Sequence, residues 1–224
     1  MNYPDLINNF IHTYIIDLIL PEACLGCKIK GEIICSNCFL KIKRAERETG
    51  EGILACFDYR DPLIKKAIWD LKYHNRFIIG KKFGEVLYES FLENIAYLKI
   101  YTKGIPILVI PVPLYNSRQK KRGYNQAKII AESFCKSSEK EILKLMDNVV
   151  IKQINTEQQA KLTNRSRRIK NIRGAFKIIN NEKIKGQTII IIDDVTTTGG
   201  TITEIIKILK KSGAKKVIGL AVAH

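Results

Sequence analysis

The segment TIIIIDDV at 188–195 constrains the fold more than any other part of the chain. Four consecutive isoleucines are typical of a strand that is covered on both faces, as in the centre of a parallel sheet. A helical pattern follows at 199–213, and a second apolar run, KKVIGLAVAH, occupies 215–224. Strand, helix and strand in this order predict an α/β fold in which helices flank a parallel sheet.

The rest of the chain supplies further elements for such a fold. Short apolar runs predict strands at 54–59, 107–113 and 149–154. Helical spacing of apolar residues predicts helices at 64–74, 83–95 and 124–136. Ligands of parallel sheets bind at the carboxyl ends of the strands, so the segments after 107–113 and 188–195 are the candidate binding regions.

The first 20 residues have apolar side chains at helical spacing and predict an amphipathic helix. They lack the basic start and small-residue cleavage site of a signal peptide, and no apolar run is long enough for a transmembrane helix. We therefore expect a cytoplasmic protein without membrane insertion. Two domains are predicted: residues 1–50, with the helix and a cysteine-rich module, and residues 51–224, with the sheet.

Four of the six cysteines lie in the segment CLGCKIKGEIICSNC. They form two C-x-x-C pairs, Cys24 with Cys27 and Cys35 with Cys38, and each pair can offer two thiolates to one tetrahedral ion. Because four sulfur ligands leave no position for water, the spacing predicts a structural Zn²⁺ site. Two disulfides or four free thiols are the alternatives, and disulfides are uncommon in cytoplasmic proteins.

The balance of charges indicates the kind of partner. The chain has 38 Lys and Arg against 22 Asp and Glu, which gives a formal net charge of +16. Such an excess favours nucleic acids or phosphorylated substrates, although a lysine-rich surface can also serve solubility alone. Basic residues cluster at 118–122 and at 165–173, so we expect a polyanion to meet these clusters.

Two carboxylates, Asp193 and Asp194, end the isoleucine strand. Such a pair can bind Mg²⁺ or accept hydrogen bonds from vicinal hydroxyls. The following turn brings threonine hydroxyls, glycines that let backbone N–H groups point inward, and a helix N-terminus. These groups predict a phosphate cradle formed by Thr196, Thr197, Thr198, Gly199, Gly200 and Thr201. A diol site beside a phosphate site fits a ribose 5-phosphate.

Three alternatives explain this segment less well. A Walker-B acid would need the motif G-x-x-x-x-G-K-[ST], which the sequence lacks. The acidic pocket of a receiver domain has no use for a Thr/Gly turn. A capped helix after a core strand accounts for one threonine but not for two adjacent acids.

The motif IIIIDDVTTTGGT resembles the phosphoribosyl pyrophosphate (PRPP) motif of type I phosphoribosyltransferases. With PVPLYNSRQKKRGYNQAKIIA and the double C-x-x-C, the chain resembles the ComF family in particular, which comprises competence-associated, zinc-bearing phosphoribosyltransferase-like proteins. The resemblance extends from PEACLGC to the last predicted strand. One departure is Thr196, where an apolar residue is usual in the family.

The resemblance implies a role for each part of the strand-end motif. Asp193 and Asp194 would hold the ribose hydroxyls of PRPP, and the turn from Thr197 to Thr201 would hold its 5-phosphate. Mg²⁺ would bridge oxygens of the pyrophosphate and the ribose. The phosphate cradle and the diol site that the residues themselves predict agree with these roles.

The basic residues outside the motif have weaker assignments. By resemblance, Arg118 and Arg122 would face the pyrophosphate, Lys72 is a further candidate for it, and the loop 161–173 would close over the site. Alternatively, 118–122 is a solvated basic turn or meets nucleic-acid phosphates, and Lys72 only extends its ammonium to solvent.

Two functions fit these observations. The first is an enzyme that transfers a phosphoribosyl group to an acceptor which the sequence does not identify. The alternative is a non-catalytic factor that handles single-stranded DNA during DNA uptake, with a regulatory or vestigial PRPP site and competence machinery proteins as partners. Few aromatic residues lie near the basic clusters, and the stacking candidates are Tyr115, Tyr124 and Phe176.

Overall fold

The computed structural model describes residues 22–46, 52–139, 141–155 and 172–224. The helix predicted over the first 20 residues lies outside these ranges, as does nearly all of the predicted closing loop. The chain divides into two compact units, 1–43 and 44–224, which are described separately. The predicted domain boundary at residue 50 stays a prediction.

Two short turns and a helix make up the described part of the first unit. Ala23 and Lys30 form an antiparallel bridge that closes the first turn, and the backbone N–H of Cys24 donates to the carbonyl of Ile29 at 2.8 Å. The helix α2 (Ser36–Leu40) begins directly after Cys35. The two cysteine pairs are therefore placed by a turn and by a helix start.

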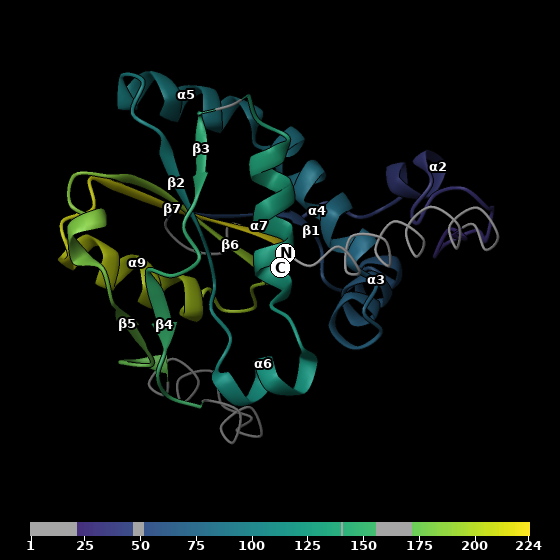
Figure 1. The fold of residues 1–224 in the computed structure, drawn as a ribbon. Coiled ribbons are helices and arrows are strands. Elements are labelled where there is room, and N and C mark those ends of the chain that lie inside the picture. Colours follow the sequence, from purple (N-terminus) through teal and green to yellow (C-terminus); the bar gives the residue numbers. More distant parts are fainter. Residues whose placement is uncertain (1–21, 47–51, 140, 156–171) are drawn as a thin grey trace, which may run out of the picture. The chain divides into compact units, whose positions relative to one another are not determined.

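A five-stranded parallel sheet forms the centre of the second unit (Figure 1), in the order β1-β7-β6-β2-β3. Its strands, in chain order, are β1 (Ile53–Phe57), β2 (Ile107–Pro111), β3 (Leu143–Leu145), β6 (Thr188–Val195) and β7 (Lys216–Ala223). The predicted parallel sheet is thus confirmed. The predicted strand at 188–195 has the observed bounds of β6.

The isoleucine run explains why β6 lies in the middle of the sheet. Ile189, Ile190, Ile191 and Ile192 are each 0% exposed. Successive side chains point to opposite faces of a strand, so both faces of β6 are covered. Burying an isoleucine side chain stabilises the fold by about 1.5–3 kcal/mol, which makes this strand a large contributor to stability.

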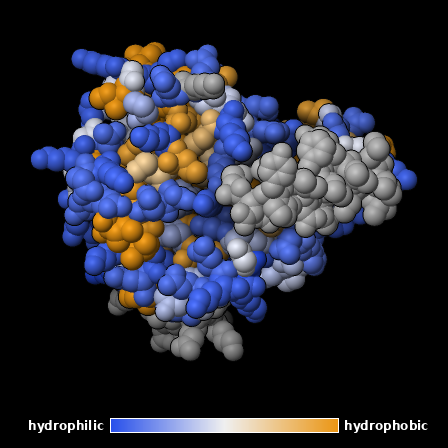
Figure 2. Space-filling view, in the orientation of Figure 1, coloured by the Kyte–Doolittle hydropathy of each residue, from blue (hydrophilic) through white to orange (hydrophobic). Residues whose placement is uncertain are grey.

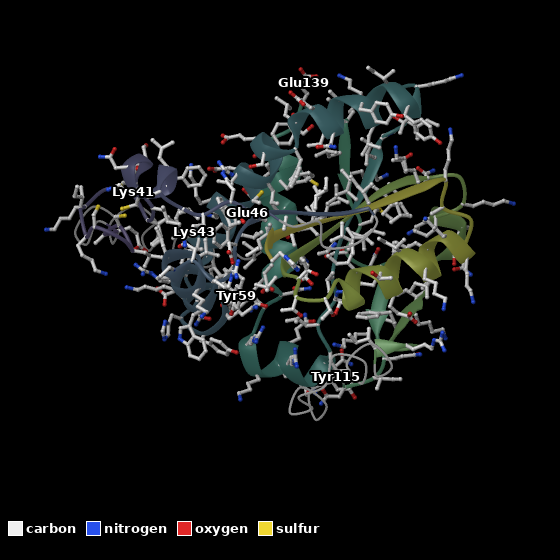
Figure 3. The ribbon with its side chains drawn as sticks, turned by 180° about the vertical axis from the view of Figure 1, so that it is seen from behind. Lys41, Lys43, Glu46, Tyr59, Tyr115 and Glu139 are labelled. Atoms are coloured by element: carbon white, nitrogen blue, oxygen red, sulfur yellow. The ribbon has the colours of Figure 1, made fainter. Side chains whose placement is uncertain are left out.

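Helices cover the sheet. The α-helices of this unit are α3 (Pro62–Tyr73), α4 (Phe77–Ser90), α5 (Leu92–Thr102), α6 (Asn116–Arg122), α7 (Gln126–Lys136) and α9 (Gly200–Lys211), and a 3-10 helix, η2, spans Asn181–Lys183. Helix α7 packs on β2 and β6 and also against α4, whereas α9 packs on β7, β6 and β5. Figure 3 shows Tyr115, which precedes α6, and Glu139, which follows α7, at opposite ends of this unit.

Helices α4 and α7 approach each other closely at Gly84. A Cβ atom at this position would lie 2.5 Å from the carbonyl oxygen of Ile130 and 2.5 Å from the Cβ of Ser133. Only glycine leaves room for these neighbouring atoms. The contact holds α4 against α7, and α3 packs in turn on α4.

Three predictions about individual elements were wrong or incomplete. The single helix predicted at 83–95 is replaced by α4 and α5, which meet at Phe91. The basic turn at 118–122 is the last part of the helix α6. The strand predicted at 149–154 forms as β4 (Val150–Lys152), but it pairs antiparallel with β5 (Phe176–Ile178) outside the main sheet.

Most of the face seen in Figure 2 is hydrophilic, with several separate apolar patches. Large apolar side chains that are exposed among the described residues include Trp69, Tyr73, Tyr97 and Ile100. Among the described helices, none combines the length and the apolar character needed to cross a lipid bilayer.

Candidate functional site

The carboxyl ends of the central strands carry the candidate site. Strand β6 ends in Asp193, Asp194 and Val195. Its neighbours hold this end in place, because the N–H of Val112 donates to the carbonyl of Ile192 at 2.8 Å and the N–H of Thr196 donates to that of Ala223 at 2.9 Å. The acids therefore lie at a rigid edge, where ligands of parallel sheets bind.

The turn after β6 leads into α9 without a side-chain cap. Gly199 is the N-cap residue and has a φ of 72°, a conformation that glycine adopts without strain. No acidic residue lies in the first turn of α9, and the Thr198 hydroxyl accepts a long hydrogen bond of 3.4 Å from the Gly200 N–H. The N-terminal amides of α9, with their partial positive charge, are thus suited to an anion.

The predicted cradle residues do not all face the same way. Thr197 is exposed, and Thr198, Gly200 and Thr201 are half-buried. Thr196 is only 4% exposed, so its side chain belongs to the interior. An apolar residue suits such a buried position, and burial makes Thr196 the weakest of the predicted phosphate contacts.

Lys72 joins the strand end from α3. Its Nζ lies 3.0 Å from the Oδ2 of Asp194. Burial alone would lower the pKa of Lys72, but the charges of Asp194 and Asp193 and the hydrogen bond to Asp194 outweigh it, so this pKa is raised. Lys72 therefore lies beside the carboxylates, and its predicted contact with pyrophosphate stays a prediction.

The charge of Asp193 is less well balanced by a cation than the charge of Asp194, which pairs with Lys72. It is half-buried, and its Oδ1 accepts a hydrogen bond of 2.8 Å from the Asp194 N–H. Burial, and next the charge of Asp194, raise the pKa of the Asp193 carboxyl to about 7. Lys72 forms its direct ion pair with Asp194, and its charge only partly offsets the effects that raise the pKa of Asp193. The pair therefore retains the capacity to bind hydroxyl groups or a divalent cation.

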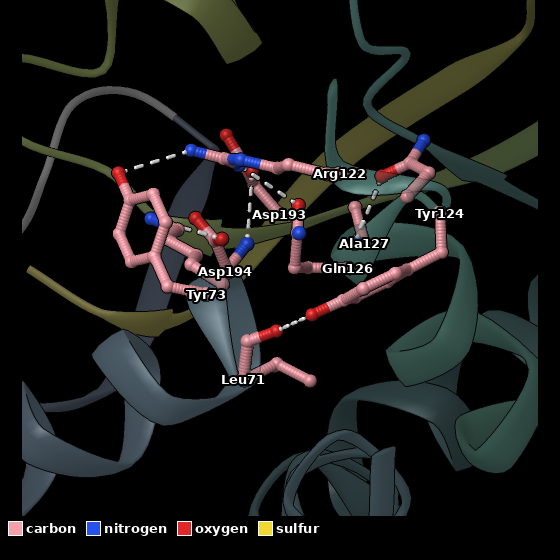
Figure 4. A network of polar contacts seen from close by, with 10 residues as sticks. Leu71, Tyr73, Arg122, Tyr124, Gln126, Ala127, Asp193 and Asp194 are labelled. Atoms are coloured by element: carbon pink, nitrogen blue, oxygen red, sulfur yellow. Dashed lines mark hydrogen bonds and ion pairs between the residues drawn. The ribbon is translucent and has the colours of Figure 1, made fainter. Parts of the chain in front are cut away.

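Arg122 lies near this pair and is held by two side chains (Figure 4). Its Nη1 donates to the Oε1 of Gln126 at 3.1 Å and its Nη2 donates to the Tyr73 hydroxyl at 3.3 Å. The guanidinium carbon also lies 5.1 Å from the centre of the Tyr73 ring. This side chain is thus oriented by its neighbours, which a solvated basic turn would not require.

A cavity of about 360 Å³ opens beside these residues, between α3 and α6. It is lined by Lys72, Tyr73, Asn75, Arg118, Lys121 and Arg122. Arg118 and Arg122, predicted from the sequence to face one ligand, therefore share a cavity with Lys72. Two further cavities at the same edge of the sheet are lined partly by Tyr115 and Lys152, and by Tyr59 and Thr197.

Sequence reasoning missed the residues that join these segments. Asn125 caps α7 by accepting from the Ala127 N–H, and its Nδ2 donates to the carbonyl of Val112 at 3.0 Å. The Tyr124 hydroxyl donates to the carbonyl of Leu71 (Figure 4). These bonds connect the loop after β2 with α3. No local pattern signals them, because the partners are far apart in sequence.

The cavity around Thr197 lies at the ends of β1 and β7. The His224 ring Nε2 is 3.0 Å from the Thr197 carbonyl, and Tyr59 donates its N–H to the carbonyl of His224. Asp58, Tyr59, Arg60 and Glu46 also line this cavity of about 270 Å³, and Figure 3 shows Tyr59 and Glu46 close together. This pocket adjoins the predicted phosphate cradle at Thr197.

The four predicted zinc ligands come together in the first unit. The Sγ atoms of Cys24, Cys27, Cys35 and Cys38 lie within 4.8 Å of one another, and the Cys27–Cys35 distance is 3.5 Å. In a tetrahedral zinc site the sulfurs are about 3.8 Å apart. The cluster is therefore compatible with one structural metal ion, and all four cysteines are free of disulfides.

Comparison with known proteins gives a consistent result. Residues 120–224 match the phosphoribosyl transferase domain family. Over 206 residues the chain is 27% identical to competence protein F of Haemophilus influenzae, covering 87% of this chain and 86% of that protein. It is 29% identical over 206 residues to DNA utilization protein YhgH of Escherichia coli O157:H7, with coverage of 88% and 86%.

A shorter match is more similar. Competence protein ComFC of Bacillus subtilis is 33% identical over 106 residues, which are 47% of this chain and 39% of that protein. The domain match begins within α6 and includes β6 and α9, so the strand-end site lies inside the part that resembles phosphoribosyl transferases.

Proposed function

Because this chain belongs to the ComF family, we propose that it binds Mg²⁺-PRPP at the carboxyl end of β6 and takes part in DNA uptake. Asp193 and Asp194 hold the ribose hydroxyls, and the turn from Thr197 to Thr201 holds the 5-phosphate. The names of the relatives support the cellular role. The geometry of the strand end supports the ligand.

One observation carries the proposal: two carboxylates immediately precede a helix N-terminus that has no side-chain cap and no acid in its first turn. The carboxylates suit a diol and the helix N-terminal amides suit a phosphate, the two groups that a ribose 5-phosphate presents. The cations of Arg118 and Arg122 lie in the adjoining cavity and suit the pyrophosphate group.

The residues also fit phosphoribosyl transfer. In this reaction an acceptor nitrogen bonds to C1 of the ribose while the bond from C1 to the pyrophosphate oxygen breaks, and its electron pair leaves with pyrophosphate. Asp193 and Asp194 stabilise the positive charge that develops on the ribose, and Arg122 stabilises the negative charge on pyrophosphate. Mg²⁺, when bound, neutralises charge on the phosphate oxygens.

We further propose that the four-cysteine cluster holds one structural Zn²⁺. Cys24, Cys27, Cys35 and Cys38 supply four sulfurs near tetrahedral spacing. Such an ion would stabilise a small unit in which α2 has only five residues.

The second candidate function is the non-catalytic handling of single-stranded DNA. It is favoured by the formal net charge of +16 and by relatives whose names refer to competence and DNA utilization. In that case PRPP would regulate binding of the DNA rather than serve as a substrate.

Isothermal titration with Mg²⁺-PRPP tests the ligand. We expect binding by the wild type and a loss of tenfold or more in the double variant Asp193→Asn/Asp194→Asn, because each lost charged hydrogen bond is worth about 1.5–3 kcal/mol. A release assay for pyrophosphate then separates an enzyme from a PRPP-binding regulator.

A matched control is the double variant Glu93→Gln/Glu139→Gln, which also removes two acids. Glu93 lies on α5 and Glu139 pairs with Lys99 of the same helix, at the other end of α7 from the site. It should bind PRPP like the wild type. Equal affinity of the Asp193/Asp194 variant and the wild type would show that the ligand lies elsewhere.

A further inference from the structure

Helix α3 presents two exposed aromatic rings beside the basic cavity. Trp69, the only tryptophan of the chain, is 57% exposed, and Tyr73, one turn later, is 50% exposed. Their ring centroids are 4.3 Å apart and the ring planes are tilted by 48°. The two rings thus form a continuous aromatic surface that faces solvent.

The packing of α3 does not account for these rings. The helix is anchored by Ile64, Ala67, Ile68 and Leu71, which are buried at helical spacing. Lys65 and Lys66, which precede Trp69 by one turn, are exposed like it. A contiguous exposed aromatic surface with cations around it marks an interaction site rather than a core.

Cations surround the rings on the side of α6 as well. Arg122 contacts Tyr73 through its ring and its hydroxyl, as described above. The adjoining cavity of about 360 Å³ is lined by four cations, and among its described lining residues there is no acid. The surface therefore combines π-faces with a concentrated positive charge.

From this arrangement we infer that α3 and α6 bind single-stranded nucleic acid, with a base stacked on Trp69 and Tyr73 and its phosphates at Arg118, Lys121 and Arg122. Only unpaired bases can stack on a protein ring, whereas a duplex offers mainly its phosphates. A protein partner would more often present an apolar patch with few charges. The inference rests on the second candidate function and gives it a location.

This location differs from the one expected from sequence. Of the predicted stacking residues, Phe176 is only 4% exposed, so the prediction that a base stacks on it was wrong. Tyr124 is half-buried and its hydroxyl is bonded to Leu71. Tyr115 is half-buried and lines another cavity. Tyr73 contacts Arg122 of the predicted basic cluster, and Trp69 extends this surface through its contact with Tyr73.

Lys72 connects this surface with the strand end. It lines the cavity and also pairs with Asp194 at 3.0 Å. Arg118 and Arg122 are likewise assigned to pyrophosphate in the proposed function. Since one set of cations serves both anions, Mg²⁺-PRPP and the nucleic acid should compete, and saturating PRPP should weaken oligonucleotide binding.

The single tryptophan allows a direct test on the full chain. Titration with oligo(dT) should quench the Trp69 fluorescence, whereas inorganic polyphosphate, which has phosphates but no bases, should bind with little quenching. Fluorescence anisotropy of a labelled oligonucleotide then measures the affinity of variants. Trp69→Leu should weaken binding about fivefold or more, because one stacked base is lost.

Salt dependence separates the two kinds of contact. Trp69→Leu should leave the slope of log affinity against log salt unchanged. Lys121→Gln should reduce that slope by about 0.7, the value for one phosphate of a single strand. Tyr97→Leu is the matched control, because Tyr97 is 59% exposed and Lys216 lies 4.6 Å from its ring, but it belongs to α5 at the other end of the sheet.

The outcomes separate the surface from the function. Three results would refute the proposed location on α3 and α6 and leave the second candidate function standing. They are unchanged oligonucleotide affinity in Trp69→Leu, an equal loss of affinity in Tyr97→Leu, and equal quenching of Trp69 fluorescence by polyphosphate. No oligonucleotide binding at low salt would refute that function itself. Far-ultraviolet circular dichroism of each variant confirms that the fold is retained.

Discussion

Replacing Asp193 with asparagine should stabilise the free protein while it removes ligand binding. Asp193 and Asp194 are adjacent, and the nearby cation Lys72 is paired with Asp194. Burial and the charge of Asp194 raise the pKa of Asp193 from 3.8 to about 7. Ionised Asp193 therefore costs the folded state free energy that Asp193→Asn should recover.

The size of the gain follows from the shift. Each pKa unit corresponds to about 1.4 kcal/mol, so the full shift gives an upper bound near 4 kcal/mol. Because Asp193 is half-buried, solvent screening reduces this to about 1–2 kcal/mol. For a domain of this size, such a gain raises the melting temperature by about 2–8 °C.

The sign of the pH dependence is fixed by linkage. The pKa of Asp193 is higher in the folded state than in the unfolded state. Its contribution to wild-type stability therefore falls as pH rises from about 4 to about 7, and it is least favourable above pH 7. The advantage of Asp193→Asn should be about a third of its full size at pH 5 and nearly full at pH 8. Asparagine keeps an oxygen to accept from the Asp194 N–H, so the local hydrogen bond survives.

Thermal melts at pH 5 to 8, without PRPP or Mg²⁺, measure this effect. The advantage should grow in a Lys72→Met background, where the carboxylates lose their counter-charge. Asp147→Asn is the control, because Asp147 is 38% exposed and pairs with Lys128 at the surface. A variant Asp193→Asn that melts at or below the wild type at pH 8, or with an offset independent of pH, would refute the reasoning.

Three further outcomes test other parts of the molecule. Elemental analysis should find one zinc per wild-type chain, retained in Cys135→Ser and lost in Cys35→Ser; zinc-free wild type, purified without chelator, would refute the site. Gly84→Ala should lower the free energy of unfolding by about 2 kcal/mol or more, since its Cβ would meet backbone of α7, and a wild-type urea midpoint would contradict this. Arg122→Lys should bind Mg²⁺-PRPP about tenfold more weakly by titration, because lysine cannot reproduce the fork that meets Gln126 and the ligand; unchanged affinity would place pyrophosphate elsewhere.

Local signals made the central sheet predictable. The isoleucine run and the pattern after it identify β6, α9 and β7, because buried parallel strands and amphipathic helices have distinct periods. Helix α5 was missed because its apolar residues are spread around the helix and give no single stripe. Strands β3 and β5 have three residues each, which is too short for a pattern.

The same distinction applies to the candidate site. The two acids and the Thr/Gly turn are contiguous, so their chemistry is visible in one short segment. The contacts of Lys72 with Asp194, and of Tyr73 with Arg122, join segments that are brought together only by the fold. The exposure of Trp69 was equally hidden, since a tryptophan within a helical apolar pattern is usually buried.

The strand order also bears on how the protein is made. Strand β7, the last along this sequence, lies between β1 and β6, the strand that carries the acids. While the ribosome has not yet released β7, β1 has no partner and one edge of β6 is open. The sheet can therefore close only after β7 has been made, and such non-local pairing is slow. A nascent chain would complete this end of the sheet only once β7 has emerged, and a chain that terminates before β7 would expose strand edges to aggregation and to quality-control proteases.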